Sequence, residues 1–81
     1  MYELMPLQNL RPGQTAHIDS LDGVADQLRR LREIGLRQGS RIEMIRPGYP
    51  CIIRLDGSTL CYRGCRRTRI MVRPTPADVA L

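Results

Sequence analysis

Residues 28–39 read Leu28-Arg29-Arg30-Leu31-Arg32-Glu33-Ile34-Gly35-Leu36-Arg37-Gln38-Gly39. Leu28 and Leu31 are three positions apart, so they share one helix face, while arginines fill the polar side near the helix end, where positive charge suits the dipole. Gly35 stands where a left-handed residue is needed to end the helix, and Leu36 then closes on it as the apolar contact. After a second turn at Gly39 the chain enters a strand. The segment therefore predicts a rigid helix-to-strand corner.

The residues before this corner predict a strand followed by the helix. A strand is expected from Gln14 to about Leu21, with Ala16 and Ile18 pointing inward and His17 and Asp19 outward, because strand side chains alternate. The helix is expected from about Val24 to Ile34. Asp22 would cap its N-terminus, and its buried stripe would comprise Leu21, Val24, Leu28 and Leu31.

The residues after the corner predict four more strands, at about 40–46, 51–55, 58–63 and 69–73. Asp56-Gly57 is a strong hairpin signal, and a two-residue turn there pairs Cys51 with Tyr62 and Ile52 with Cys61. Residues 64–68 read as a short linker, with room for one helical turn. Residues 1–6 read as a loose lead-in. In the last strand Ile70 and Val72 are expected to point inward.

These elements predict a mainly β fold. Five short strands with one helix between the first two cannot form an open parallel sheet, because the connections are too short for crossovers. A small five-stranded antiparallel barrel is the economical arrangement. The 81 residues are expected to form one domain over 1–81, with its core at about 7–73 and a mobile tail at 74–81.

The composition limits the chemistry. All 13 basic residues are Arg, against 8 acidic residues, so the net charge is +5 and no lysine is present for Schiff-base chemistry. One His, no nucleophile in a recognisable context and no glycine-rich phosphate loop argue against an enzyme. No apolar run approaches the ~18 residues of a membrane helix. Residues 1–4 lack the basic start and apolar core typical of a signal peptide, so export is not expected. Reduced cysteines in the cytoplasm are the simplest interpretation.

The sequence resembles the ferrous iron transport protein A (FeoA) family over about residues 7–73. The most specific part is the segment LRRLREIGLRQG at 28–39, in which Gln38 replaces the proline usual in the family. Similar motifs are the Leu and Pro-Gly of Leu7–Gly13, the strand Ala16–Leu21, the segment Gly57–Arg63 and the final Ile-x-Val at 70–72. Arg67 departs from the family, which usually has alanine there.

The resemblance implies an SH3-like barrel with one inserted helix, and a protein that is an adaptor rather than an enzyme. The expected partner is a membrane ferrous iron transporter with a cytoplasmic GTPase domain. The protein would then be cytoplasmic, at the inner face of the membrane through its partner. Related domains act as regulatory modules of iron-dependent repressors, so a stand-alone metal-binding or metal-sensing module is the alternative.

A metal site would have to use the three cysteines and the histidine, namely Cys51, Cys61, Cys65 and His17. Three thiolates and an imidazole would suit zinc, and Fe²⁺ or another transition metal is the other candidate. The expected hairpin register places Cys51 and Cys61 on opposite faces, however, and no Cys-x-x-Cys pair exists. No cofactor is firmly predicted.

A docking surface is expected on the outer face of the barrel, where apolar residues lie near arginines. The candidates are Ile45, Ile52, Arg54, Arg63, Arg66, Arg67 and Met71. A nucleic-acid-binding barrel is a third possibility, but only three tyrosines are available for base stacking, so no nucleic acid partner is predicted. An exposed strand edge would also allow a homo-oligomer.

Overall fold

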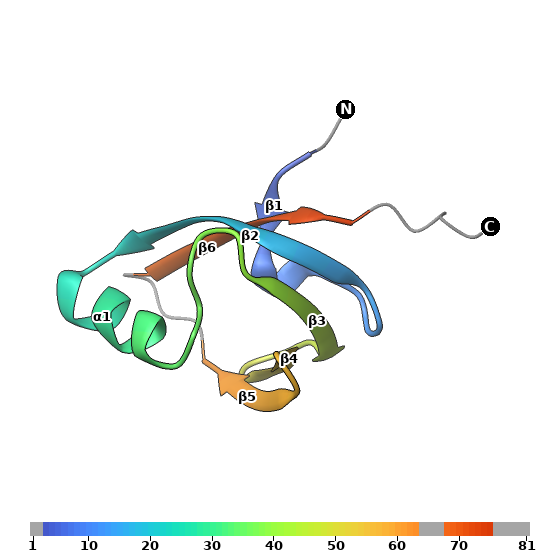
Figure 1. Cartoon of the computed structure of the whole chain (residues 1–81). Helices are drawn as coiled ribbons and strands as arrows, with labels where there is room; N and C mark the ends of the chain where they lie inside the picture. Colours follow the sequence, from blue (N-terminus) through green and yellow to red (C-terminus); the bar gives the residue numbers. More distant parts are fainter. Residues whose placement is uncertain (1–2, 64–67, 76–81) are drawn as a thin grey trace.

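The computed structural model describes residues 3–63 and 68–75. In this part of the chain, one antiparallel sheet has the strand order β1-β6-β2-β3-β4-β5 (Figure 1). The elements, in chain order, are β1 (Met5–Pro6), the 3-10 turn η1 (Leu7–Asn9), β2 (Thr15–Gly23), α1 (Ala25–Glu33), β3 (Arg41–Arg46), β4 (Cys51–Leu55), β5 (Ser58–Tyr62) and β6 (Thr68–Pro74). The mainly β fold with one helix after the first long strand is confirmed.

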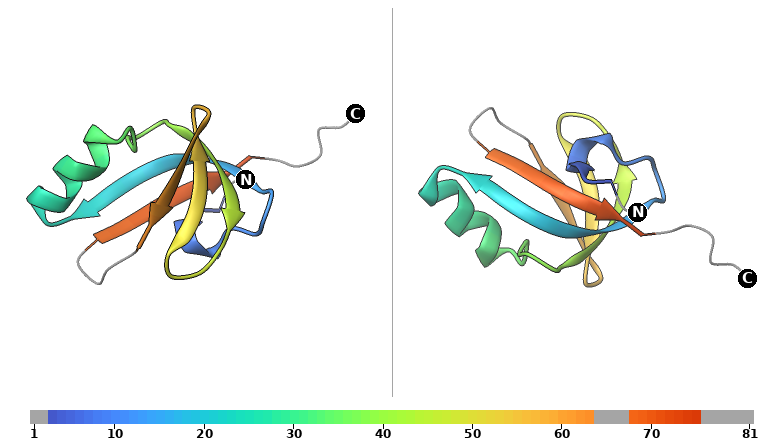
Figure 2. Two further views of the ribbon diagram at one scale, coloured as in Figure 1. Left: turned by 90° about the horizontal axis from the view of Figure 1, so that it is seen from below. Right: turned by 90° about the horizontal axis from the view of Figure 1, so that it is seen from above.

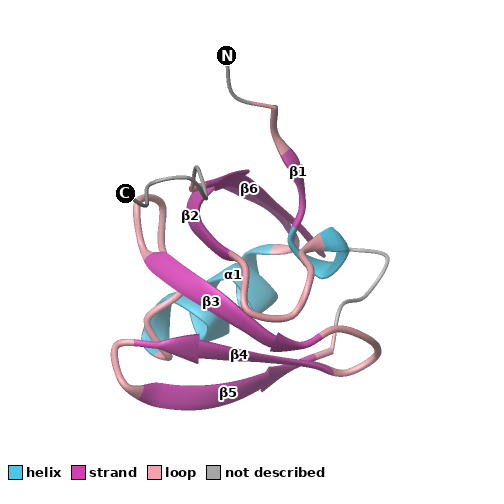
Figure 3. Ribbon diagram, turned by 90° about the vertical axis from the view of Figure 1, so that its right-hand side faces the viewer, coloured by secondary structure: helices cyan, strands magenta, loops and turns pink. Residues whose placement is uncertain are grey.

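The sheet bends back on itself into a small barrel. Figure 2 shows the β4–β5 hairpin crossing β2 and β6, and Figure 3 shows β3, β4 and β5 as one layer below β2 and β6. The core between the layers is apolar and mostly aliphatic, and no polar or charged side chain of the described residues is buried. Ala16, Ile18, Ile70 and Val72 are all buried, as the alternation predicts.

The N-terminal strand was not expected. Met5 pairs with Val72 and Pro6 with Met71, so this segment is a sixth strand rather than a loose lead-in. Directly after it, Leu7 is fully buried. The sequence prediction of five strands is therefore one short strand too few, because a two-residue strand has no periodicity to recognise and is defined by its partner β6.

The hairpin between β4 and β5 forms as the sequence predicts. Asp56 and Gly57 adopt positive φ values of 50° and 82°, which match the twist of a two-residue hairpin turn. The turn sets the register, so Leu55 pairs with Ser58 and Cys51 with Tyr62. The positions of all side chains on this hairpin follow from that register.

The C-terminal end of α1 is closed by a Schellman motif centred on Gly35. The Leu36 N–H donates to Leu31 O at 2.9 Å and the Gly35 N–H donates to Arg32 O at 3.0 Å. Gly35 has φ 101°, the left-handed conformation that the sequence predicts there. Leu31 and Leu36 are both buried, so the apolar contact that accompanies this motif is present.

The N-terminal end of α1 differs from the prediction. The helix begins at Ala25 with Val24 as N-cap residue and no side-chain cap, because Asp22 is still part of β2. Of the predicted stripe, Leu31 is buried, Leu21 and Leu28 are half-buried, and Val24 is 42% exposed. The helix thus lies at one end of the barrel and contributes only its C-terminal turns to the core (Figure 1).

Candidate functional site

The cysteines do not come together as metal ligands in the described part of the chain. Cys51 is buried on β4, whereas Cys61 is exposed on β5. Because Cys51 pairs with Tyr62 and Ile52 with Cys61, the two thiols lie on opposite faces of the hairpin. Burial raises the pKa of the Cys51 thiol, which disfavours the thiolate that a metal needs. Cys65 lies outside the described residues.

His17 is also remote from a ligand set. It lies on β2, where its register partners on the neighbouring strands are Arg41 on β3 and Arg73 on β6. Two flanking cations oppose the binding of a third cation. Within residues 3–63 and 68–75, no group of three His, Cys, Asp or Glu side chains is placed to hold a metal ion. The donors in these residues therefore do not fit a metal centre.

The residues predicted to dock a partner divide between two parts of the barrel. Ile45 and Ile52 are half-buried on the outer side of β3 and β4, and Arg54 lies nearby in an ion pair with Glu43 at 3.2 Å. Ile45 is the extra residue of a bulge in β3, since Met44 pairs with Ile53 and Arg46 with Ile52.

Met71 lies apart from that pair. It is on β6 between Pro6 and Ser20, and two strands of the sheet separate it from β4. Arg63 is exposed at the end of β5. Arg66 and Arg67 lie outside the described residues, so the structure does not place them. The described candidates thus do not form a single continuous patch.

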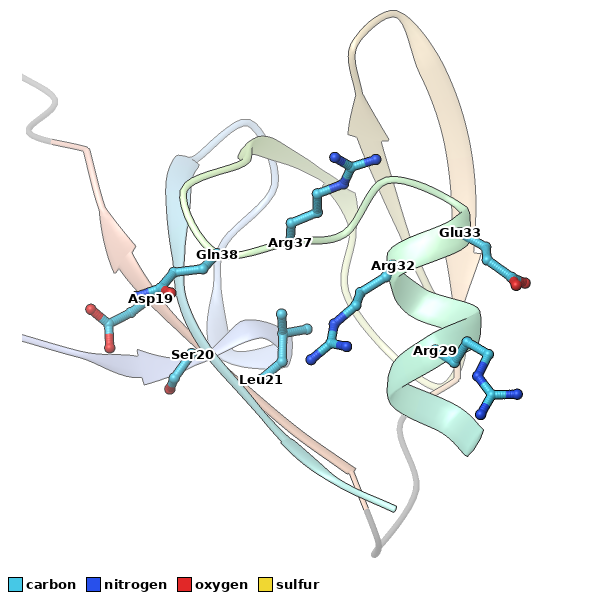
Figure 4. Close-up of a pocket in the computed structure, with 8 residues that line it drawn as sticks. All are labelled: Asp19, Ser20, Leu21, Arg29, Arg32, Glu33, Arg37 and Gln38. Carbon is cyan, nitrogen blue, oxygen red and sulfur yellow. The ribbon is translucent and has the colours of Figure 1, made fainter. Parts of the chain in front are cut away.

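A broad concavity lies where α1 and the corner after it face β2. It encloses about 690 Å³ and is lined by Asp19, Ser20, Leu21, Arg29, Arg32, Glu33, Arg37 and Gln38 (Figure 4). The lining therefore includes three arginines from the segment 29–37. We refer to this site as the arginine pocket.

Backbone hydrogen bonds hold the wall of the arginine pocket in place. The Gly39 N–H donates to Ile18 O at 2.8 Å, and the Ile18 N–H donates to Ser40 O at 2.9 Å, which ties the corner to β2. The Ser40 hydroxyl donates to Gly35 O at 3.1 Å across the same loop. Arg37 thus lies on a rigid loop, and Arg32 lies on the helix that precedes this loop.

The acidic residues of the pocket do not neutralise its arginines. Asp19 pairs instead with Arg73 of β6, at 3.9 Å. Figure 4 shows Arg32 extending from α1 towards Leu21, while the carboxylates of Asp19 and Glu33 point away from the space between helix and strand. Among the described residues, Arg29, Arg32 and Arg37 form no ion pair. Unpaired guanidinium groups of this kind bind carboxylates or phosphates through paired N–H groups.

The arginine pocket was not predicted from the sequence. The arginines of the corner read as the polar side of a helix, and nothing in that pattern joins them to β2. The spacing of arginines at 29, 32 and 37 around Gly35 was the available signal. What the spacing alone does not show is the backbone pairing of Gly39 and Ser40 with Ile18, which brings the loop beside the strand.

No helix among residues 3–63 and 68–75 has the length and apolar character that crossing a bilayer requires. The nine-residue α1 is the α-helix of this part of the chain.

Comparison with solved structures supports the SH3-like barrel. An iron uptake regulatory protein (FeoA) is similar with a TM-score of 0.79 and 24% identity, over 90% of this chain and 100% of its own. The FeoA protein from Chlorobium tepidum is similar with a TM-score of 0.79 and 28% identity, over 91% of this chain and 73% of its own.

A third similar structure is the FeoA of Stenotrophomonas maltophilia in complex with zinc, described as a prokaryotic SH3 domain protein and a suggested activating factor of bacterial ferrous iron transport. Its TM-score is 0.70 at 24% identity, over 84% of this chain and 88% of its own. No curated protein sequence matches the chain significantly.

The family model of the FeoA domain matches residues 5–74, which include every strand and the helix of the structure. The resemblance seen in the sequence at the corner 28–39 thus extends over nearly the whole fold. The chain belongs to the FeoA family.

Proposed function

We propose that this protein is a non-enzymatic accessory of ferrous iron transport that docks on the cytoplasmic part of a GTPase-coupled membrane iron transporter. Membership of the FeoA family, which is implicated in ferrous iron transport, supports the role. The suggested activating role of the Stenotrophomonas maltophilia relative supports the accessory character. The protein would act in the cytoplasm, at the membrane only through its partner.

The observation that carries the docking proposal is the arginine pocket. Arg32 and Arg37 stand on a rigid corner and have no acidic partner among the described residues, so they are available to carboxylates of another protein. The formal net charge of +5 adds a long-range attraction to an acidic surface. Exposed charges of this kind steer association and fix its orientation, more than they add affinity.

The test is a binding titration of the purified cytoplasmic domain of the transporter with this protein. The double reversal Arg32→Glu with Arg37→Glu should weaken binding about tenfold or more, since each lost charge pair is worth up to about 1 kcal/mol and tenfold corresponds to about 1.4 kcal/mol. The matched control is Arg11→Glu with Arg46→Glu, which changes the net charge equally at exposed positions outside the pocket.

The binding of the wild-type protein should weaken as salt is raised, and the slope should be smaller in the pocket variant. An absence of wild-type binding at low salt, with no nucleotide, GDP or a GTP analogue present, would contradict the proposal. Equal weakening by the pocket pair and the control pair would show that net charge, and not the arginine pocket, directs the docking.

A metal-binding module is the second candidate, and one observation favours it: the Stenotrophomonas maltophilia relative was solved with zinc. In this chain the described cysteines lie on opposite faces and the histidine lies between arginines. A titration of the reduced protein with zinc distinguishes the two candidates, because only a metal-binding module would bind the ion stoichiometrically.

A further inference from the structure

The helix α1 has a second open side, opposite the arginine pocket. Here a concavity of about 350 Å³ separates the helix from strand β5. Its helix wall is Gln27, Arg30, Leu31 and Ile34, and its strand wall is Cys61, Tyr62 and Arg63. Thr68 of β6, whose hydroxyl donates to Gln27 Oε1, also lines it. We refer to this concavity as the α1–β5 groove. It shares no lining residue with the arginine pocket.

The floor of the groove is apolar and partly open. Leu31 and Tyr62 are each 9% exposed and form the bottom, while Ile34 is 48% exposed at the helix end. Ile34 is the C-cap residue of α1, so its position is fixed by the hydrogen bonds that close the helix. Ile34 therefore extends the apolar floor formed by Leu31 and Tyr62 out to the surface of the groove.

The strand wall of the groove is a sheet edge. Among the described strands β5 is the last in the sheet order, so it pairs with β4 on one side and with none of them on the other. In an antiparallel pair the residues alternate between those that bond the neighbour and those that point away. Leu55 and Ser58 close the two-residue turn, and therefore the N–H and C=O groups of Thr59 and Cys61 point away from β4.

Within the described part of the chain, these outward-pointing backbone groups of Thr59 and Cys61 form no hydrogen bond with another segment. These four groups are the pattern that an incoming extended segment pairs with when it adds a strand to a sheet. The groove therefore combines a main-chain template with an apolar floor.

The charge of the groove selects the partner. Among the described residues that line the groove, the two charged ones are Arg30 on the helix and Arg63 after the strand end, and none is a carboxylate. Neither arginine forms an ion pair among the described residues. A second copy of this chain would bring another formal charge of +5 to the surface, so repulsion opposes self-association here.

We propose that the α1–β5 groove binds an extended acidic segment of a partner protein, which pairs as a strand with the free edge of β5. In a strand, alternate side chains point to opposite sides. One set would carry apolar groups onto Ile34 and Tyr62, and the other would carry carboxylates to Arg30 and Arg63. The inference rests on the proposed function only for the identity of the partner, and defines the segment through which docking occurs.

The binding experiment uses the full chain labelled with ¹⁵N and a blocked hexapeptide that alternates Glu and Val. Addition of the peptide should shift the amide resonances of Thr59, Cys61 and Ile34 before those of β1, the other sheet edge. A peptide that alternates Lys and Val should bind about tenfold more weakly or not at all, since its charges face Arg30 and Arg63. Equal binding of the two peptides would overturn the charge argument and with it the proposal.

Two pairs of variants separate the features of the groove. Ile34→Glu places a carboxylate in the apolar wall and should weaken the binding of the acidic peptide about tenfold or more. Val24→Glu is its control, because Val24 is a similarly exposed residue at the other end of the same helix. Equal effects of the two changes would contradict the proposed site.

Thr59→Pro tests strand pairing directly. A proline at an edge position whose N–H points outward keeps the β4–β5 ladder but removes one donor from the free edge. Thr59→Val keeps that donor and is the control. The proline variant should fold with an unchanged β4–β5 register and lose peptide binding, and retained binding would overturn the strand-addition geometry.

Sedimentation of the free protein tests whether a second copy of the chain occupies the groove instead. If the wild type forms a dimer and Thr59→Pro is monomeric, a second copy fills the groove, and the proposal of an acidic partner is overturned.

If the transporter domain binds Ile34→Glu and Thr59→Pro as tightly as the wild type, this inference fails while the proposed function stands. If the acidic peptide binds and the transporter domain does not, the groove stands and the proposed function fails.

Discussion

Gly35 lies so close to Leu55 that a methyl group on Gly35 would stand 2.9 Å from Leu55 Cδ2. The residue that ends the helix thus packs directly against the β4–β5 hairpin. Leu55 is only 4% exposed, so its side chain cannot turn aside without disturbing the core. Gly35 therefore has two roles: its backbone conformation ends the helix, and its lack of a side chain allows the close contact with Leu55.

Gly35→Ala should therefore destabilise the protein more than Gly39→Ala. Both residues have positive φ, 101° and 89°, which costs an alanine roughly 1–2 kcal/mol. At Gly39 an added methyl group meets nothing within 4 Å, whereas at Gly35 it meets Leu55. Urea unfolding of both variants measures the difference, and equal losses would show that only the backbone conformation matters.

Val24→Asp should stabilise the protein. Val24 is the N-cap residue of α1, has extended φ and ψ, and provides no side-chain cap for the helix. An aspartate there accepts a bond from an unpaired helix N–H and typically contributes about 1 kcal/mol, which for a domain of this size is a rise of about 4–8 °C in Tm. Val24→Ala is the control for the loss of the valine, and equal Tm values for the two variants would contradict the capping argument.

Cys51 should make the protein less stable at alkaline pH. Burial raises the pKa of this thiol above its ordinary value of 9.0. The unfolded chain therefore loses its proton first as pH rises, so the stability contributed by the neutral thiol is present below pH 9.0 and is lost as pH rises through the folded pKa.

The measurement is the free energy of unfolding between pH 7 and 11 for the wild type, Cys51→Ala and Cys61→Ser. The wild type and Cys61→Ser should lose more stability in this range than Cys51→Ala does. The excess loss should be at most about 1.4 kcal/mol for each unit by which folding raises the pKa of the Cys51 thiol. Parallel curves for all three proteins would show that this thiol contributes no pH dependence.

Zinc and Fe²⁺ should not bind at a site that needs Cys51 and Cys61 together. The two thiols lie on opposite faces of the β4–β5 hairpin, and one ion cannot bond both without a change of register. An anaerobic calorimetric titration of the reduced protein, with Cys51→Ala, Cys61→Ser and Cys65→Ser beside it, tests this. Stoichiometric binding with proton release that both Cys51→Ala and Cys61→Ser abolish would contradict the structure.

The features that the sequence predicts correctly are set by residues close to one another in the chain. Asp56-Gly57 specifies a two-residue turn, and the turn alone fixes that Cys51 faces Tyr62. Gly35 specifies the helix stop through its conformation. The alternation of Ile70 and Val72 holds because one side of β6 is buried.

The features that the sequence does not predict depend on distant parts of the chain. Val24 has helical spacing but is exposed, because α1 lies over the end of the barrel and only its later turns reach the core. Met71 and Ile45 read as one outer surface, yet β6 is next to β2 and not to β3 or β4. The two proposed docking sites likewise need the helix to be placed between β2 and β5 before they exist.

The position of β6 in the sheet constrains how this protein is made. β6 pairs with β1 on one side and with β2 on the other, although some fifty residues of sequence separate it from β2. When the chain leaves the ribosome, residues 5–23 emerge before residues 68–74. Among the described strands, β1 therefore has no partner, and β2 has only β3, until β6 is made. Pairings of this range are slow to form. The barrel therefore closes only after synthesis of β6. A chain interrupted before residue 68 would leave β1 and one edge of β2 open to other unfolded chains.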